Sequence, residues 1–183
     1  MKLLFTTLVC VFALTITSCK KIAEALQTSI SASPKVIEFE IPKLAANTSE
    51  VTFKEVQVKI DMDSLVKASA PGFGSRNIKS IKLRSFKLEL SNADDASNFA
   101  NLESVNGFLN CEGKEPLQVV AIPNNPDTKA SILNVPISSE GIELKEYLAG
   151  GTFRYVLKSK VRRATAKGLN ARATVVYDFT LGL

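Results

Sequence analysis

Hydrophobic and polar residues alternate with a period of two along most of the chain beyond residue 35. In the segment 36–41, for example, Ile37, Phe39 and Ile41 alternate with two glutamates. Successive side chains of a β-strand point to opposite faces, so this pattern predicts a strand with one buried face. Segments of the same character cover residues 51–60, 81–90, 104–111, 116–122, 130–137, 153–161 and 173–181.

Two of these segments change phase once. Their apolar residues fall at positions 51, 53, 56, 58 and 60, and again at 81, 83, 86, 88 and 90. A slip of one residue turns the buried face outward unless the strand absorbs an extra residue. We therefore predict one β-bulge near 54–55 and another near 84–85. The alternative is a bend where each strand passes from one sheet to another.

Proline, serine and glycine residues define the weaker elements. The segment 130–137 contains a proline, which cannot donate to a β-ladder, so we expect this strand at a sheet edge. Ser138 or Ser139 is expected to cap a short helix that ends at Gly150-Gly151. Asp63 is expected to cap another short helix or to lie in its first turn.

The last two strand segments, 153–161 and 173–181, predict a C-terminal hairpin whose inward side chains are aromatic and β-branched. Eight candidate strands and one or two short helices predict a mostly β fold, an antiparallel β-sandwich of about seven to nine strands. The one-sided alternation argues against a parallel α/β sheet, whose strands would be apolar throughout.

The first nineteen residues have a different character. A cationic residue, Lys2, precedes an apolar run from Leu3 to Ile16, and Thr17-Ser18-Cys19 follow. A charged start, an apolar centre and small residues at the cut are typical of a secretory signal. The run is too short for a transmembrane helix, which needs about 20 apolar residues. The cysteine placed directly after small residues resembles the lipobox of bacterial lipoproteins.

This resemblance implies that Cys19 is diacylated on sulfur, becomes the new N-terminus and is then acylated on nitrogen. Several acyl chains hold a protein firmly at a membrane. By the sorting pattern of that family, Lys20 in place of an aspartate after the cysteine implies the outer membrane in a cell that has one. We accordingly expect a signal peptide over residues 1–18, a lipidated tether over 19–34 and one β-sandwich domain over 35–183. A signal cleaved without lipidation is the alternative.

Net charge limits the expected binding partners, and cysteine content limits the expected disulfides. Cleavage after residue 18 removes one lysine and leaves 22 basic and 18 acidic residues, a net charge of +4 over 165 residues. This balance is only moderately basic, and an exported chain seldom meets nucleic acid, so we expect no nucleic-acid partner. Cys111 would have no partner for an intramolecular disulfide and is expected to be a small buried apolar residue.

The chain contains no histidine. That removes Ser-His-Asp triads, Cys-His pairs and histidine metal sites. Carboxylates occur in two pairs, Asp61 with Asp63 and Asp94 with Asp95, and such residues are common in turns for local structural reasons. A Ca²⁺ site at Asp94, Asp95 and Asn98 is the alternative, although the spacing is not that of an EF-hand. We expect no enzyme activity, no catalytic residue, no metal and no cofactor.

Basic residues form the best candidate binding surface. Those on the strand 153–161 share parity and so point to one side of a sheet. The predicted ligand contacts are Arg154, Lys158, Lys160, Arg162 and, on the returning strand, Arg172. A second cluster consists of Lys82, Arg84 and Lys87. A positive sheet face can hold an anionic glycan, a lipid headgroup or an acidic protein. The alternative is a solvated outer face with no ligand.

These observations favour a non-enzymatic envelope lipoprotein, held at the membrane through lipidated Cys19. Its β-sandwich would act as a binding or assembly module for an envelope protein or an anionic glycan. A second hypothesis is a carrier that holds an apolar ligand or lipid between its sheets. A hydrolase is the third and least favoured, because histidine and tryptophan are both absent from the chain.

Overall fold

A computed structural model describes residues 27–137 and 140–183. The predicted signal peptide, Cys19 and most of the predicted tether lie outside these residues, as do Ser138 and Ser139. The described part of the chain folds into nine strands, two α-helices and two short 3-10 helices. In chain order they are β1 (Thr28–Ala32), β2 (Ile37–Ile41), β3 (Asn47–Lys59), α2 (Met62–Ser69), η1 (Ser75–Asn77), β4 (Ile78–Leu90), η2 (Phe99–Asn101), β5 (Val105–Asn110), β6 (Leu117–Ile122), β7 (Ile132–Val135), α3 (Lys145–Leu148), β8 (Thr152–Val161) and β9 (Leu169–Leu181).

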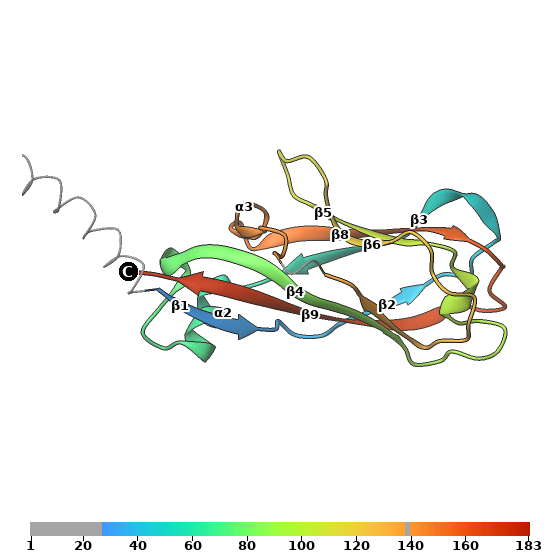
Figure 1. Cartoon of the computed structure of the whole chain (residues 1–183), viewed down its shortest axis with the longest axis horizontal. Helices are drawn as coiled ribbons and strands as arrows, with labels where there is room; N and C mark the ends of the chain where they lie inside the picture. The colour runs from blue at the N-terminus through green and yellow to red at the C-terminus, as the bar shows by residue number, and fades with distance from the viewer. Residues whose placement is uncertain (1–26, 138–139) are drawn as a thin grey trace, which may run out of the picture.

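The strands form two antiparallel sheets packed face to face (Figure 1). Sheet A has the order β1-β9-β4-β7, and β2 also pairs with β9 on the side of β1. Sheet B has the order β3-β8-β5-β6. The inward side chains of both sheets are apolar and buried, and they form one core. The predicted antiparallel β-sandwich is confirmed, and β7 lies at an edge of sheet A as its proline indicated.

Both predicted bulges are present. In β3, the pairing with β8 shifts by one residue between Thr52 and Lys54. In β4, the pairing with β9 shifts by one residue between Leu83 and Ser85. Each bulge absorbs one residue, so the apolar positions on both sides of it remain on the buried face. The phase slips in the sequence therefore mark bulges within single sheets.

The predicted C-terminal hairpin is wrong. β8 pairs with β3 and β5 in sheet B, whereas β9 pairs with β1, β2 and β4 in sheet A. The segment 162–168 therefore connects the two layers instead of closing a hairpin. Alternation specifies which face of a strand is buried, and that face is the same whether the next strand lies beside it or opposite it.

The predicted tether extends too far. Residues 28–32 form β1, an edge strand that pairs with residues 177–181 of β9. Between β1 and β2 the edge is interrupted, and the Ser33 hydroxyl donates a hydrogen bond to the carbonyl of Val175, 2.6 Å away. The short alternation of isoleucine and alanine with serines in this segment is a strand pattern. Its small polar residues are also typical of a linker, which is why composition alone predicts a tether here.

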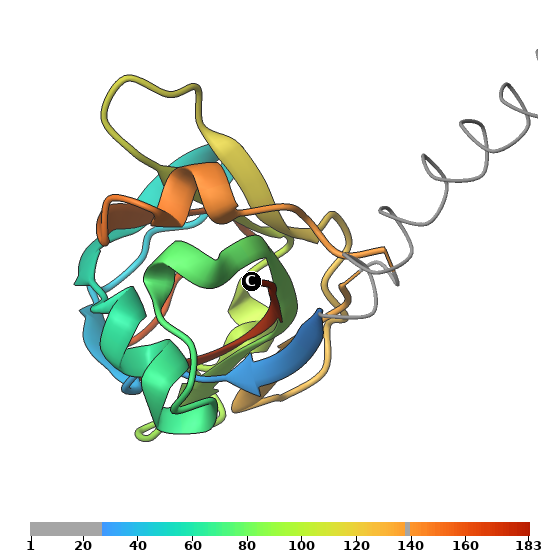
Figure 2. The ribbon, with the colours of Figure 1, turned by 90° about the vertical axis from the view of Figure 1, so that its left-hand side faces the viewer.

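Both α-helices lie at one end of the sandwich, beside the start of β1 and the end of β9 (Figure 2). Asp61 caps α2 by accepting a hydrogen bond from the backbone of Ser64, and Asp63 lies in the first turn. α3 begins only at Lys145, with Leu144 at its N-cap, so the prediction of a serine cap at 138 or 139 is wrong. Leu148 of α3 is fully buried against the core.

Candidate functional site

The structure separates the predicted basic residues. Arg154, Lys158 and Lys160 lie on the outer side of β8, and Arg162 follows the end of that strand. Arg172 lies on β9 in the opposite sheet. The five predicted contacts do not share one face, because β8 and β9 belong to different sheets. Three of the five lie on one strip of sheet B.

Contacts within the chain occupy most of these cations. Arg154 lies 3.6 Å from the carboxylate of Glu55, and Arg172 lies 3.0 Å from that of Glu38. The Lys158 ammonium lies 4.9 Å from the centre of the Phe108 ring, a cation–π contact. Exposed pairs of this kind contribute little to stability, but they reduce the positive field of the strip.

Arg162 has a structural role. Its guanidinium donates hydrogen bonds to the carbonyl oxygens of Ala100, at 2.9 Å, and Asn125, at 2.8 Å. These bonds attach the end of β8 to η2 and to the loop that contains Asn125. A guanidinium engaged in this way is not free to bind a ligand.

The second basic cluster lies on the outer face of sheet A. Arg84 lies 3.3 Å from the carboxylate of Asp178, and Lys87 lies 3.0 Å from that of Glu89. Lys82 donates to the backbone carbonyl of Glu140, 2.6 Å away. Acidic residues thus alternate with the basic ones, and the outer face of sheet A is mixed in charge.

Three of the paired carboxylates, Asp61, Asp63 and Asp94, are stabilised as anions. Hydrogen bonds from Ser64 lower the pKa of Asp61, and the Lys67 ammonium lowers the pKa of Asp63. The Lys167 ammonium, 2.7 Å away, lowers the pKa of Asp94. A general acid for glycoside cleavage needs the opposite shift.

The carboxylates at 94 and 95 do not converge on a cation site. Asp95 forms an ion pair with Lys129, and Asp94 with Lys167. The Asn98 side chain caps η2 and donates to the backbone carbonyl of Asp94. Within residues 27–137 and 140–183, no group of three or more acidic, cysteine or histidine side chains is placed to hold a metal ion.

Cys111 is partly buried at the end of β5. Its thiol lies 2.8 Å from the backbone carbonyl of Tyr147, to which it donates a weak hydrogen bond. Partial burial raises the pKa of this thiol. A raised pKa lowers the fraction of thiolate, which is the nucleophilic form.

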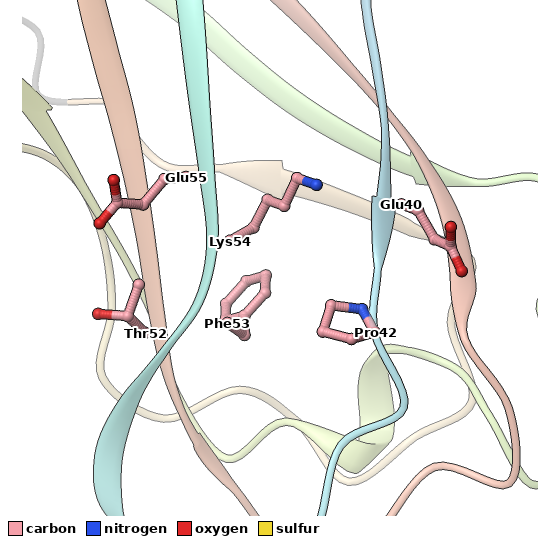
Figure 3. Close-up of a pocket in the computed structure, with 6 residues that line it drawn as sticks. All are labelled: Glu40, Pro42, Thr52, Phe53, Lys54 and Glu55. Carbon is pink, nitrogen blue, oxygen red and sulfur yellow. The ribbon is translucent and has the colours of Figure 1, made fainter.

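Two shallow concave surfaces lie where the edges of the two sheets approach each other, between β2 and β3 (Figure 3). One part is lined by Glu40, Pro42 and residues 52–55, and it measures about 500 Å³. A second part is lined by residues 34–38 and 57–60, and it measures about 560 Å³. We call the two together the seam groove.

Strand edges form the walls of the seam groove. Consecutive residues line it on both sides, although their side chains alternate between opposite faces of a strand. The surfaces that these residues share are therefore the strand edges, with their backbone N–H and C=O groups. Among the described strands, β3 pairs only with β8 and β2 only with β9, so the edges that face the groove have no strand partner there.

The side chains that line the seam groove are of two kinds, apolar and charged. Phe53 and Lys54 point from β3 into the groove, whereas the carboxylates of Glu40 and Glu55 point away from the space between the two strands (Figure 3). The Lys54 ammonium lies 6.0 Å from the centre of the Phe39 ring on β2, so it reaches across the groove. Val36, which lines the second part, is 39% exposed. An apolar floor with charged sides suits a polypeptide segment of mixed composition.

Sequence reasoning missed the seam groove, because its walls come from different sheets. One signal was available. Pro34 and Pro42 bracket the strand at 36–41, and proline on both sides of a short strand is typical of a sheet edge. No comparable signal identifies β3 as an edge strand.

The comparisons with known proteins leave the function open. No model of a known protein family matches the chain, and no curated protein matches it. Among solved structures, the chain is similar to the BFDV capsid protein at 10% identity, over 84% of this chain and 99% of that one, with a TM-score of 0.32. A chain of Turnip Yellow Mosaic Virus gives 12% identity, 85% and 94% coverage, and a TM-score of 0.31.

A chain of infectious bursal disease virus gives 9% identity and a TM-score of 0.34 over 85% of this chain, which spans only 33% of the viral one. Similarities this low carry no argument about function. In the part of the chain that the structure describes, no helix has the length and apolar character needed to cross a bilayer.

Proposed function

We propose that this chain is a non-enzymatic lipoprotein of the bacterial cell envelope, anchored through Cys19 at the outer membrane, that binds an extended segment of another envelope protein in the seam groove. The anchor rests on the sequence of residues 1–19. The binding role rests on one observation, the pair of strand edges without partners that line the seam groove. Such edges are templates for an added strand.

The edge of β3 restricts where a partner can pair. The bulge between Thr52 and Lys54 interrupts the regular spacing of the strand, whereas residues 55–59 pair with β8 without a shift. A bulge prevents regular ladder formation on the other edge as well. We therefore place the partner strand along residues 55–59. An apolar side chain of the partner would lie beside Val36, which lines the groove opposite residues 57–60.

The remaining geometry favours binding over the other two hypotheses. Carboxylates with lowered pKa values are poor general acids, and the chain has no histidine to replace them. A lipid carrier needs an interior cavity, but large buried side chains, including Phe86, Tyr177 and Phe179, fill the space between the sheets. A binding role needs only the surface groove.

A photo-crosslinking experiment in the native host tests this proposal. A photoreactive amino acid replaces Gln57, which is exposed on β3, in the full-length chain. The matched control carries it at Gln118, an exposed glutamine on β6 at the opposite edge of the same sheet. Both are compared with a Cys19→Ser version, and the products are identified by mass spectrometry.

We expect a discrete envelope protein crosslinked from position 57, absent from position 118 and reduced by the Cys19→Ser change. Equal products from both positions would refute binding in the seam groove. A chain that remains in the envelope with unmodified Cys19 would refute the anchor. A stoichiometric lipid retained by the unanchored chain would favour the carrier instead.

A further inference from the structure

A small pocket opens at the end of the sandwich that carries the helices. Its apolar wall consists of Met62 at the start of α2 and of Ile78 and Ile81 on β4. Two cationic residues, Arg76 and Lys145, also line it, and its volume is about 270 Å³. We call it the end pocket. With this lining, the end pocket combines an apolar wall with two positive charges.

The chain enters the sandwich beside this pocket. Thr28, the first residue of β1, pairs with Leu181, and Leu181 pairs on its other side with Ile78 of the pocket wall. One strand thus separates the point of entry from the end pocket. Figure 2 views the molecule from this end, where α2, α3 and the end of β9 lie together.

The length of the chain before Thr28 limits how the domain can stand on a membrane. This step rests on the proposed lipid anchor at Cys19. Nine residues lead from Cys19 to Thr28, so even a fully extended chain spans at most about 30 Å. Strand β4 has 13 residues and is about 43 Å long. The opposite end of the sandwich therefore cannot reach the bilayer, and the helix-bearing end can.

The charges at the end pocket suit the headgroups that this end would meet. Arg76 is exposed and Lys145 half-buried, and within the described residues neither forms an ion pair. A guanidinium and an ammonium both bind phosphate, and each basic residue near an anionic lipid surface contributes about 1 kcal/mol. We infer that the end pocket docks on the bilayer and takes the headgroup of an anionic phospholipid, with its phosphate between Arg76 and Lys145.

Depth-dependent fluorescence quenching tests this inference on the full-length lipidated chain. The chain is reconstituted in nanodiscs of phosphatidylglycerol and phosphatidylcholine with headgroup-attached quenchers. A fluorophore is placed on Gly72→Cys, next to α2, where an added side chain meets open space, or on Thr128→Cys at the opposite end. Both carry Cys111→Ala, so that only the introduced thiol is labelled.

We expect strong quenching at position 72 and little at position 128, with a dependence on phosphatidylglycerol. Replacing both Arg76 and Lys145 with glutamine should lower the equilibrium constant for docking about 30-fold, from about 1 kcal/mol for each charge. Lys79→Gln is the matched control, since it removes a charge at the same end from a residue that does not line the pocket. It should change docking far less than the double substitution.

Two results would overturn the inference, namely equal quenching at both positions, or quenching that the Arg76 and Lys145 substitutions leave unchanged. The mass of the purified chain shows separately whether the chain is acylated. If the chain is acylated and quenching is equal at both positions, docking through the end pocket is refuted and the proposal of the lipid anchor is not. A chain without acyl groups refutes the anchor, and quenching at position 72 by vesicles then tests the pocket alone.

Discussion

The hydroxyl oxygens of Tyr155 and Tyr177 lie 2.6 Å apart and form a hydrogen bond across the interior of the sandwich. Tyr155 belongs to β8 in sheet B and Tyr177 to β9 in sheet A, and both are buried. Aromatic rings surround the pair, with Phe86 and Phe153 edge-on to Tyr155 at 5.7 and 5.5 Å. A polar contact in an apolar core thus links the two sheets.

Removing both of these hydroxyls should cost less than the sum of the two single removals. Tyr155→Phe or Tyr177→Phe leaves the other hydroxyl buried without its partner, which costs about 1–3 kcal/mol of unfolding free energy. The double substitution removes both polar groups, so we expect it to be less destabilising than the sum of the single changes. Urea unfolding of the unsubstituted chain, the two single variants and the double variant forms a double-mutant cycle. Additive single effects would contradict a direct bond between the two residues.

The same pair should make stability fall at high pH. Burial raises the pKa of Tyr177 to about 12 and raises the pKa of Tyr155 well above its usual range. In an unfolded chain, phenols ionise near pH 10. Up to that point both states keep the protons, and the tyrosine contribution to stability is constant. Between about pH 10 and 12 the unfolded state loses protons first, so the free energy of unfolding decreases.

Urea unfolding across this pH range measures the decrease. The variant with phenylalanine at both positions is the control, because it keeps the core volume and lacks the two phenols. It should lose less stability than the natural chain as the pH rises. Parallel decreases in the two proteins would show that other groups dominate.

Deleting residues 174–183 should prevent folding. The segment contains four buried inward side chains, Val175, Tyr177, Phe179 and Leu181. Burial of such side chains contributes about 1.5–3 kcal/mol each, about 6–12 kcal/mol in total, which is comparable to the whole stability of a domain. Circular dichroism and resistance to proteolysis would report the loss. Deletion of Leu183 alone, which is 80% exposed, should leave the domain folded.

Asn125 should be far more important for stability than its neighbour Asn124. The buried Asn125 amide donates to the carbonyls of Phe99, at 2.7 Å, and Leu102, at 3.0 Å. Asn125→Ala removes these donors from buried acceptors, with an expected cost of about 1–3 kcal/mol. Asn124 is exposed, and Asn124→Ala should change stability by less than about 0.5 kcal/mol. Similar melting temperatures for the two variants would contradict this role.

The sequence predicted the features that depend only on the residues within one strand, namely its position, its bulge and the direction of its side chains. Alternation located the strands from residue 36 onward, and the phase slips located the bulges in β3 and β4. Both follow from the rule that a side chain faces either the core or the solvent. The outward orientation of Arg154, Lys158 and Lys160 followed from the same rule.

The sequence did not predict the features that depend on which strands lie side by side, namely the strand order and the seam groove. β8 and β9 have the inward pattern of a hairpin, yet they face each other across the core, and Arg172 therefore lies on the far side of the molecule from Arg154. The seam groove likewise exists only because β2 and β3 are edges of different sheets. Its recognition needed the strand order, which no local pattern contains.

The position of β9 within sheet A has a consequence for biogenesis. Chains that leave the cytoplasm through a narrow translocation channel must pass it unfolded. β9 follows every other strand of this sequence, yet it holds β1, β2 and β4 together. Sheet A therefore lacks its organising strand until these late residues are available, and pairings between distant parts of a chain form slowly. For a chain exported as we propose, this order would prevent sheet A from forming until β9 itself has been synthesised.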